Sequence, residues 1–471
     1  MKRGRSSVPP RSHMSGTLKH RTLNAPSLRQ TPLRREELTA FFASGVKRPA
    51  DLQIGVEWEK LGVYRDSGQA IRYQGPRGVE GIFRALAARY GWTPVRESGR
   101  IIALEKHGSS ITLEPGGQIE LSGRKAFALR DNAAELREHL AQIRSVSSPL
   151  GIAWLGLGVQ PFSRLQDIEW VPKERYTIMR SSLRRGALTH HMMKRTASIQ
   201  ISLDYTSEAD AVRKLRLGLA LAPFLEALLA NSPFSEGRTG PFLSKRARIW
   251  TRTAPERSGP LEAAFEKGFG FAAYAEHALD VPLIFIVRND RWLAPKNLTF
   301  REFLEKGWKG YHATLADWEL HLTTLFTDTR LKTYIEIRSV DCQGTEVGLG
   351  VPALIKGLFY DETAFARAWS IAGALTTAQR RRLTAGVREK GLRAAFRGGT
   401  VLDAARELVK AAGEGLWRLA AGNVKLKEDP AFLRPIEALA REGRCPAERL
   451  LDRFPGPAID PVELVSAISI A

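Results

Sequence analysis

Apolar and polar positions repeat with two different periods along this chain. Segments with a period of two, or with a short continuous apolar run, predict β-strands. These segments are IGVEWEKLGV, RIIALEKHG, SSITLEP, QIELSG, GIAWLGLGVQ, TASIQISLDY, DVPLIFIVRND and RLKTYIEIRSV. The Pro-Gly-Gly of residues 115–117 lies between two of them and predicts a tight antiparallel turn.

Other segments place apolar residues at helical spacing. Helices are predicted over REELTAFFASGV, with Gly45 as C-terminal cap, over VEGIFRALAARYG, over residues 129–147, over EADAVRKLRLGLALAPFLEALLAN and over LADWELHLTTLF. After about residue 345 helices alone are predicted. The sequence therefore predicts an α+β fold: a basic tail over 1–35, an α+β catalytic domain over 36–345, and a helical region over 346–471 packed on it.

Composition places the chain among globular proteins that do not cross membranes. It has 471 residues, of which 43% are hydrophobic and 26% charged, and no run reaches the roughly 18 apolar residues of a membrane span. Two cysteines, Cys342 and Cys445, do not make a disulfide framework. We therefore expect a reducing, cytoplasmic compartment.

Basic residues give the chain a net charge of +21, partly concentrated before Glu36. That Arg- and Ser-rich tail is predicted to be disordered, and it also resembles an organellar transit peptide, so a plastid or another organelle is the alternative location. A start at Met14 is a plain alternative for the same segment. Zinc-finger spacing and RNA-binding aromatic signatures are absent, which argues against nucleic acid as the main partner.

Carboxylates at even spacing mark three of the predicted strand segments. Glu57 and Glu59 share one strand face, Glu114 and Glu120 flank the predicted turn, and Glu336 precedes Arg338 by two residues. Any single pair is more simply a solvated strand face, but three such segments favour a shared Mg²⁺ site, because Mg²⁺ takes carboxylates together with substrate phosphates. An ATP-using enzyme is the leading hypothesis.

Arginines add candidate anion contacts. Arg338 lies on the face of Glu336 and suits a phosphoryl group in transfer, although a structural ion pair explains it equally simply. Arg175, Arg246 and Trp250 suit the carboxylate and the aliphatic part of an amino acid, although each alone is more often a surface residue. No GxxxxGK[ST] loop and no Rossmann GxGxxG occurs, so a nucleotide would lie on the carboxylate-lined sheet.

Eight segments in order carry a family resemblance: GVEWEKLG, EPGGQIELSG, MMKRTASIQISLDY, NSPFSEG, LSKRARIWT, ALDVPLIFIVR, DWELHLTTLF and RLKTYIEIRS. Together they closely resemble plant-type glutamate–cysteine ligases, from about residue 36 to the C-terminus. The resemblance implies a cup-shaped, mainly antiparallel sheet flanked by helices, as in glutamine synthetase. It also implies that Mg²⁺ and ATP convert the γ-carboxylate of L-glutamate to an acyl phosphate that L-cysteine attacks.

The resemblance also implies roles for individual residues. Metal binding falls to Glu57, Glu59, Glu114, Glu120 and Glu336, and glutamate binding to Arg175, Arg246 and Trp250. Arg338 and Glu57 are the catalytic candidates, and Gln200 is a candidate at the ATP site. Trp58 stands where the family commonly has His, and His190 and His191 occupy a stretch usually written LD.

Three hypotheses follow for the function. The first is a glutamate–cysteine ligase, a monomer or homodimer whose partners are ATP, L-glutamate and L-cysteine. The second keeps the chemistry but joins glutamate to a different amine. The third is a non-enzymatic protein that associates with nucleic acid or a membrane surface through its basic tail, and it predicts steeply salt-dependent nucleic-acid binding.

Overall fold

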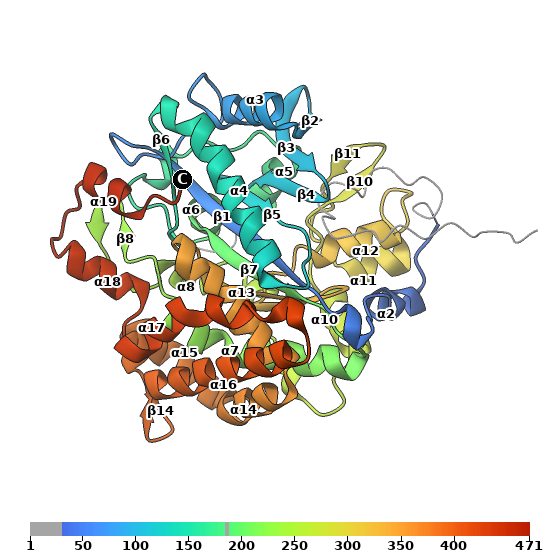
Figure 1. Cartoon of the computed structure of the whole chain (residues 1–471). Coiled ribbons are helices and arrows are strands. Elements are labelled where there is room, and N and C mark those ends of the chain that lie inside the picture. The colour runs from blue at the N-terminus through green and yellow to red at the C-terminus, as the bar shows by residue number, and fades with distance from the viewer. Residues whose placement is uncertain (1–30, 184–187) are drawn as a thin grey trace, which may run out of the picture.

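A large antiparallel sheet forms the centre of the protein, described here by a computed structural model over residues 31–183 and 188–471 (Figure 1). Within these residues the sheet has 9 strands. They are β1 (Ile54–Tyr64), β2 (Thr93–Glu97), β3 (Arg100–Lys106), β4 (Ser109–Leu113), β5 (Ile119–Ser122), β6 (Ile152–Leu155), β7 (Ser198–Leu203), β12 (Thr329–Leu331) and β13 (Ile335–Asp341). Their order is β12-β13-β7-β1-β5-β4-β3-β2, and β6 also pairs with β1.

Helices surround the sheet in the order of the chain. The first group comprises α2 (Arg35–Ala43), α3 (Val79–Tyr90), α4 (Leu129–Ser147), α5 (Glu174–Ser182), α6 (Thr189–Arg195), α7 (Glu208–Leu228), α8 (Lys245–Trp250), α9 (Pro255–Ser258), α10 (Phe271–Leu279), α11 (Phe300–Lys306) and α12 (Leu315–Leu322). The second comprises α13 (Thr345–Tyr360), α14 (Glu362–Ala372), α15 (Thr377–Lys390), α16 (Val401–Ala421), α17 (Arg434–Glu442), α18 (Pro446–Arg453) and α19 (Pro461–Ile468). In Figure 1 the orange and red helices α13–α17 gather below the sheet. None of the helices in the described chain is both long and apolar enough to cross a membrane.

Strand alternation gives the sheet one apolar and one polar face. Trp58 of β1 pairs with Ile199 of β7 and Leu121 of β5, and Ile201 of β7 pairs with Ile337 of β13. All five side chains are buried, and α13 packs against both β1 and β7 behind them. The intervening positions point to the other face and carry the polar residues of the candidate site.

Close packing fixes α13 against the apolar face. A Cβ atom added at Gly348 of α13 would lie 2.1 Å from the ring of Trp58, so only glycine allows the helix this near to β1. Gly218 of α7 is similar, because its Cβ would lie 2.6 Å from Ile337. The helices therefore hold β1 and β13, the strands that carry most of the candidate residues, in fixed positions.

A β-bulge interrupts β13. The register between β13 and β7 shifts between Ile337 and Val340, so Arg338 and Ser339 leave the regular alternation. The main-chain nitrogen of Arg338 donates instead to the carbonyl of Asp328, just before β12. Because of the bulge, the side chains of Arg338 and Ser339 contact other surroundings than regular alternation would give them.

The predicted α+β class with a mainly antiparallel sheet and flanking helices is confirmed. Predicted strands account for most of the sheet, and the predicted helix over 129–147 is α4. The predicted disordered tail falls largely on residues 1–30, which lie outside the described residues. The helical region after residue 345 also contains the short hairpin of β14 (Ala395–Phe396) and β15 (Gly399–Thr400).

Three local expectations were wrong. DVPLIFIVRND gives only β10 (Ile286–Arg288), which pairs with β11 (Arg291–Leu293) outside the main sheet, because its apolar residues pack among helices instead. RLKTYIEIRSV forms two strands, β12 and β13, around a turn in which Lys332 N donates to Tyr334 O. Gly45 is not a helix cap: its added Cβ would meet Thr333 O at 2.3 Å, so close approach explains it.

Candidate active site

The polar face of the sheet collects predicted carboxylates from β5, β1 and β13, with β7 lying between β1 and β13. Glu59 of β1 pairs directly with Glu120 of β5. Glu57 of β1 pairs with Gln200 of β7, and Ser202 of β7 pairs with Glu336 of β13. Because paired residues in an antiparallel ladder point to the same face, these acidic side chains share one surface.

Three of the five predicted metal ligands converge. One carboxylate oxygen each from Glu59, Glu114 and Glu120 lie within 4.8 Å of one another. Oxygens on opposite sides of a Mg²⁺ ion lie about 4.2 Å apart, since each Mg–O distance is about 2.1 Å. The donor set is thus of the right kind and spacing for Mg²⁺.

The hairpin between β4 and β5 brings Glu114 to this cluster. Glu114 N donates to Gln118 O, and Gly117 closes the turn with φ +86°, a left-handed conformation that favours glycine. A Cβ added at Gly116 would lie 2.2 Å from the carbonyl of Lys194, so the turn also packs closely on the end of α6. The predicted Pro-Gly-Gly turn is confirmed, and it sets where the Glu114 carboxylate lies.

Hydrogen bonds orient the other two carboxylates of the cluster. Glu59 accepts from Ser198 N at 2.6 Å and Ser198 Oγ at 3.0 Å, and from Gln200 Nε2 at 3.1 Å. Fully buried Glu120 accepts from the hydroxyls of Thr112 and Ser122. Such partners hold ligand oxygens in position.

Glu57 and Glu336 lie outside this group of three, on the same face toward β13. Glu336 is fully buried and surrounded by cations. It accepts from Arg330 Nη2 at 2.7 Å and Arg338 Nη1 at 2.7 Å, and Lys332 Nζ lies 3.1 Å away. Burial opposes its ionisation, but these three charges outweigh burial and hold the pKa of Glu336 well below its usual range.

Arg330 and Lys332 were missed in the sequence. Arg330 pairs with Glu336 across β12 and β13, and the negative charge of Glu57 acts on both cations. Burial lowers the pKa of Lys332 to about 8 even beside Glu336. Both residues belong to the RLKTYIEIRS motif. Because that motif was interpreted as one strand, the turn that brings these two residues next to Glu336 was not predicted.

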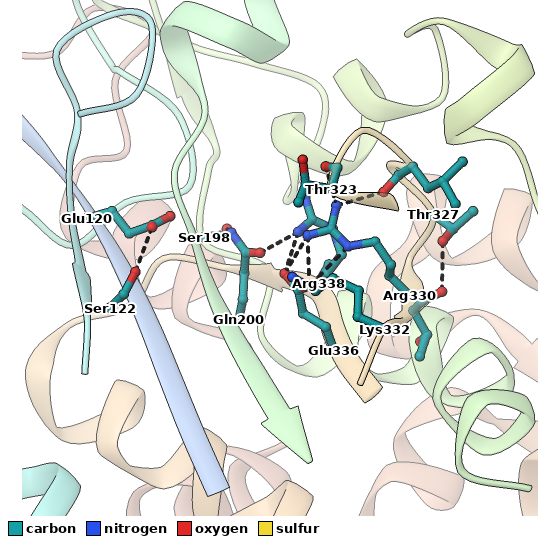
Figure 2. Close-up of polar contacts among 12 residues, drawn as sticks. Glu120, Ser122, Ser198, Gln200, Thr323, Thr327, Arg330, Lys332, Glu336 and Arg338 are labelled. Atoms are coloured by element: carbon teal, nitrogen blue, oxygen red, sulfur yellow. Dashed lines mark hydrogen bonds and ion pairs between the residues drawn. The ribbon is translucent and has the colours of Figure 1, made fainter. Parts of the chain in front are cut away.

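Gln200 connects the two halves of the polar face. Its Nε2 donates to Glu59, while its Oε1 accepts from Arg338 Nη1. Figure 2 shows Gln200 on its strand reaching toward Arg338, with Glu336 and Arg330 beside it. The carboxylate cluster and the cationic end are therefore parts of one hydrogen-bonded network.

The three predicted glutamate-binding residues line one cavity, which we call the catalytic cavity, of about 90 Å³. Arg246 is buried at 4% exposure and donates to the main-chain oxygen of Arg338 at 2.7 Å. Its guanidinium lies 5.7 Å from the Trp250 ring centre, and Arg175 lies against the Tyr176 ring. The same cavity is lined by residues of both halves of the polar face, namely Glu59, Glu114, Gln200, Arg330 and Arg338.

Comparison with known proteins identifies the family of the chain. A family model described as glutamate–cysteine ligase family 2 matches residues 53–466. The chain is 40% identical over 438 residues to a chloroplastic glutamate–cysteine ligase of Brassica juncea, covering 92% of this chain and 84% of that one. It is 39% identical to the Arabidopsis thaliana enzyme, covering 92% and 82%.

Among solved structures, a glutamate–cysteine ligase of Francisella tularensis in complex with AMP is similar with a TM-score of 0.53. Its sequence identity is 12%, and the match covers 89% of this chain and 87% of that one, so the likeness is one of fold. The resemblance stated from the motifs is confirmed by the family model and by the close relatives. The chain belongs to glutamate–cysteine ligase family 2.

Proposed function

We propose that the protein joins the γ-carboxylate of L-glutamate to the amine of L-cysteine at the expense of ATP. The products are γ-glutamylcysteine, ADP and phosphate, and the reaction is the first step of glutathione biosynthesis. The observation that carries the proposal is the single cavity lined by Glu59, Glu114, Arg330, Arg338 and Arg246. Carboxylates for a metal, cations for phosphates and an arginine for an amino acid meet there.

Glutamate binding falls to the side of the cavity formed by α5 and α8. Arg246 and Arg175 would hold the α-carboxylate, because guanidinium groups bind carboxylates through paired donors. Trp250 would cover the aliphatic part of the substrate. The γ-carboxylate of glutamate would then face Arg338, whose main-chain oxygen already holds Arg246 in place.

Phosphate binding falls to Arg330, Lys332 and Arg338. These cations surround Glu336, and a nucleotide phosphate would share them. Mg²⁺ bound by Glu59, Glu114 and Glu120 would neutralise phosphate charge, and we propose Glu57 and Glu336 as ligands of metal carried in with the nucleotide. Arg338 would stabilise charge on the phosphoryl group in transfer.

Cysteine is the proposed acceptor because the chain belongs to this family and is similar over 92% of its length to named glutamate–cysteine ligases. The acyl phosphate is reactive, so the protein need only align the attacking amine. A ligase with the same donor site and another acceptor amine is the second candidate. Trp58 does not distinguish the two, since it is buried on the apolar face of the sheet, away from the catalytic cavity.

Phosphate release in the presence of Mg²⁺ and ATP tests the reaction. We expect release only when glutamate and an amine are both present, with γ-glutamylcysteine identified by mass spectrometry. Equal release without glutamate would contradict the proposal. A panel of amines at equal concentration identifies the acceptor: a product with another amine and none with cysteine would establish the second candidate.

We propose further that the protein acts in the cytoplasm as a monomer or homodimer. An organellar location, as in the chloroplastic relatives, would require removal of part of residues 1–35. Sequencing the N-terminus of the protein from its native cells tests the location. Sedimentation over a range of protein concentrations tests the oligomeric state.

A further inference from the structure

A second, larger cavity lies on the other side of Arg246. Its volume is about 430 Å³, within the usual range for small-molecule sites, and helices α7, α8 and α15 contribute to its walls. Arg246, Trp250, Phe326 and Arg338 line both this cavity and the catalytic cavity. These four side chains are therefore a shared wall between the two spaces.

Buried polar atoms without hydrogen-bond partners gather around this second cavity. Native proteins pair almost all such atoms, so an accumulation at one place calls for a partner that the chain does not supply. Within the described residues these atoms are Arg246 Nε, Trp250 Nε1, Ser258 Oγ and Ser339 Oγ, while Glu226 Oε1 and Arg388 Nε, which also lack a hydrogen bond, form an ion pair with each other. Arg246 and Ser339 are themselves more than nine-tenths buried.

Two carboxyl groups face the cavity from separate elements, Glu226 from α7 and Asp328 from the segment before β12. Burial, against the opposing charge of Arg388 and with the support of the nearby Asp328, raises the pKa of Glu226 to about 7. The pKa of Asp328 is raised as well, by desolvation of its carboxyl, although the residue as a whole is exposed. Two carboxyls that face one cavity are a favourable place for a positively charged group.

Two arginines of α15, Arg380 and Arg388, line the same cavity. Arg388 Nε lies 3.5 Å from Glu226 Oε1, and the guanidinium of Arg380 lies over the Phe265 ring at 3.6 Å. Arginines this near the carboxyls disfavour a bare divalent metal ion, since they repel it. They suit a ligand that carries a carboxylate of its own beside its positive group.

We propose that this cavity is a second ligand site, which binds a small zwitterion, an amino acid or a short peptide, with its ammonium group at Glu226 and Asp328 and its carboxylate at Arg388 and Arg380. A ligand there contacts Arg246 from behind and completes its hydrogen bonds. It therefore changes the affinity of the catalytic cavity for glutamate. The site lies across the shared wall from the glutamate side of the catalytic cavity.

Binding stoichiometry tests the site without reference to catalysis. The full chain is titrated calorimetrically with L-glutamate, L-cysteine and γ-glutamylcysteine in turn. At least one of these compounds should bind with two equivalents per chain. The compound that does so identifies the ligand of the second site. The double variant Glu226→Gln/Asp328→Asn should lose one equivalent. Glu389→Gln, an exposed neighbour of Arg388, is the matched control and should keep both.

Arg388→Gln is a further variant, because the arginine side chain is partly exposed and its loss disturbs the core less. It too should lose the second equivalent, while thermal unfolding confirms that each variant is folded. One equivalent for every probe in the unmodified protein would overturn the proposal, as would two equivalents retained in either variant. If the protein binds two equivalents but has no ligase activity, the second site stands and only the proposed function is rejected.

Proton release supplies an independent readout. The groups that face Glu226 are Arg388 on α15, Arg246 on α8, Asp341 on β13 and Asp328. An ammonium group beside Glu226 lowers its pKa from about 7, so binding near neutral pH should release protons and weaken as the pH falls. The same titration in two buffers of different ionisation enthalpy measures this release, and no difference between the buffers would contradict the assigned orientation.

Discussion

Glu59 on β1 stands directly opposite Glu120 on β5, in the same rung of the antiparallel ladder. Like charges at such a position destabilise a sheet unless a cation lies between them. Glu114 approaches the same point from the hairpin turn. A metal ion bound by the three carboxylates would offset this repulsion.

Replacing Glu120 with Gln tests this balance. We expect Mg²⁺ to raise the thermal unfolding temperature of the unmodified protein and to have less effect on Glu120→Gln, and ligase activity to fall about 100-fold. Without metal the variant should be at least as stable as the parent. Thermal scans with and without Mg²⁺ measure both effects, and Glu105→Gln, on β3 of the same sheet, is the control.

Arg246→Lys tests the donor site. Lysine keeps the charge but loses the paired donors, so the KM for glutamate should rise about 10- to 100-fold with a smaller change in kcat. Arg248→Lys is the matched control, two residues along α8 and outside both cavities. Equal effects of the two substitutions on the KM would exclude Arg246 as a glutamate contact.

Gly348→Ala tests the packing of α13 on β1. The added methyl group meets the Trp58 ring, and overpacking of this kind should lower the free energy of unfolding by about 1–3 kcal/mol. Gly386→Ala on α15 is the contrasting case, because its Cβ meets only Ala394 at 3.6 Å. It should raise the free energy of unfolding by up to about 1 kcal/mol, through helix propensity. Urea titrations compare the two variants.

Acid stability depends on a buried histidine. Burial lowers the pKa of His321 from 6.5 to about 3, and its Nε2 lies 2.8 Å from Ala278 O. Below pH 6.5 the unfolded chain takes up a proton that the folded chain refuses. This group alone should therefore reduce the free energy of unfolding by about 1.4 kcal/mol per pH unit toward pH 3.

His321→Gln should remove that part of the pH dependence, because Gln does not titrate and its amide still reaches toward Ala278. Urea titrations measure the slope at pH values from about 7 to about 4.5, a range that crosses the pKa of a histidine in the unfolded chain. The exposed His312→Gln is the control and should keep the slope of the parent. Parallel slopes for parent and His321→Gln would contradict the prediction.

Local patterns predicted those features that depend on neighbouring residues. Alternation located Glu57 and Glu59 on β1, and the Pro-Gly-Gly turn placed Glu114 near Glu120. Features that depend on distant segments were not predictable in this way. The fold of RLKTYIEIRSV into two strands is stabilised by the buried pair of Arg330 and Glu336, which becomes visible only once the turn is known.

The second cavity was not predictable from the sequence. Its walls come from α7, α8, α15 and the segment around Asp328, which are far apart along the chain. Glu226 sits in an apolar helix, where its spacing gives no sign of a site.

Strand β2 was not predicted either. It carries a proline and half-exposed residues, so its alternation was too weak to predict a strand.

The bulge in β13 makes length, more than composition, the critical property of that strand. Removing one residue between Ile337 and Val340 would leave Val340 paired with Ile199, but it would take away Arg338 or Ser339, which both line the second cavity. Asp341, which accepts from Ser232 and Ser244, would keep its pairing with Ser198 and its place beside α8. The additional residue of β13 therefore lets Arg338 and Ser339, which are neighbours in sequence, both contribute to the wall of the second cavity.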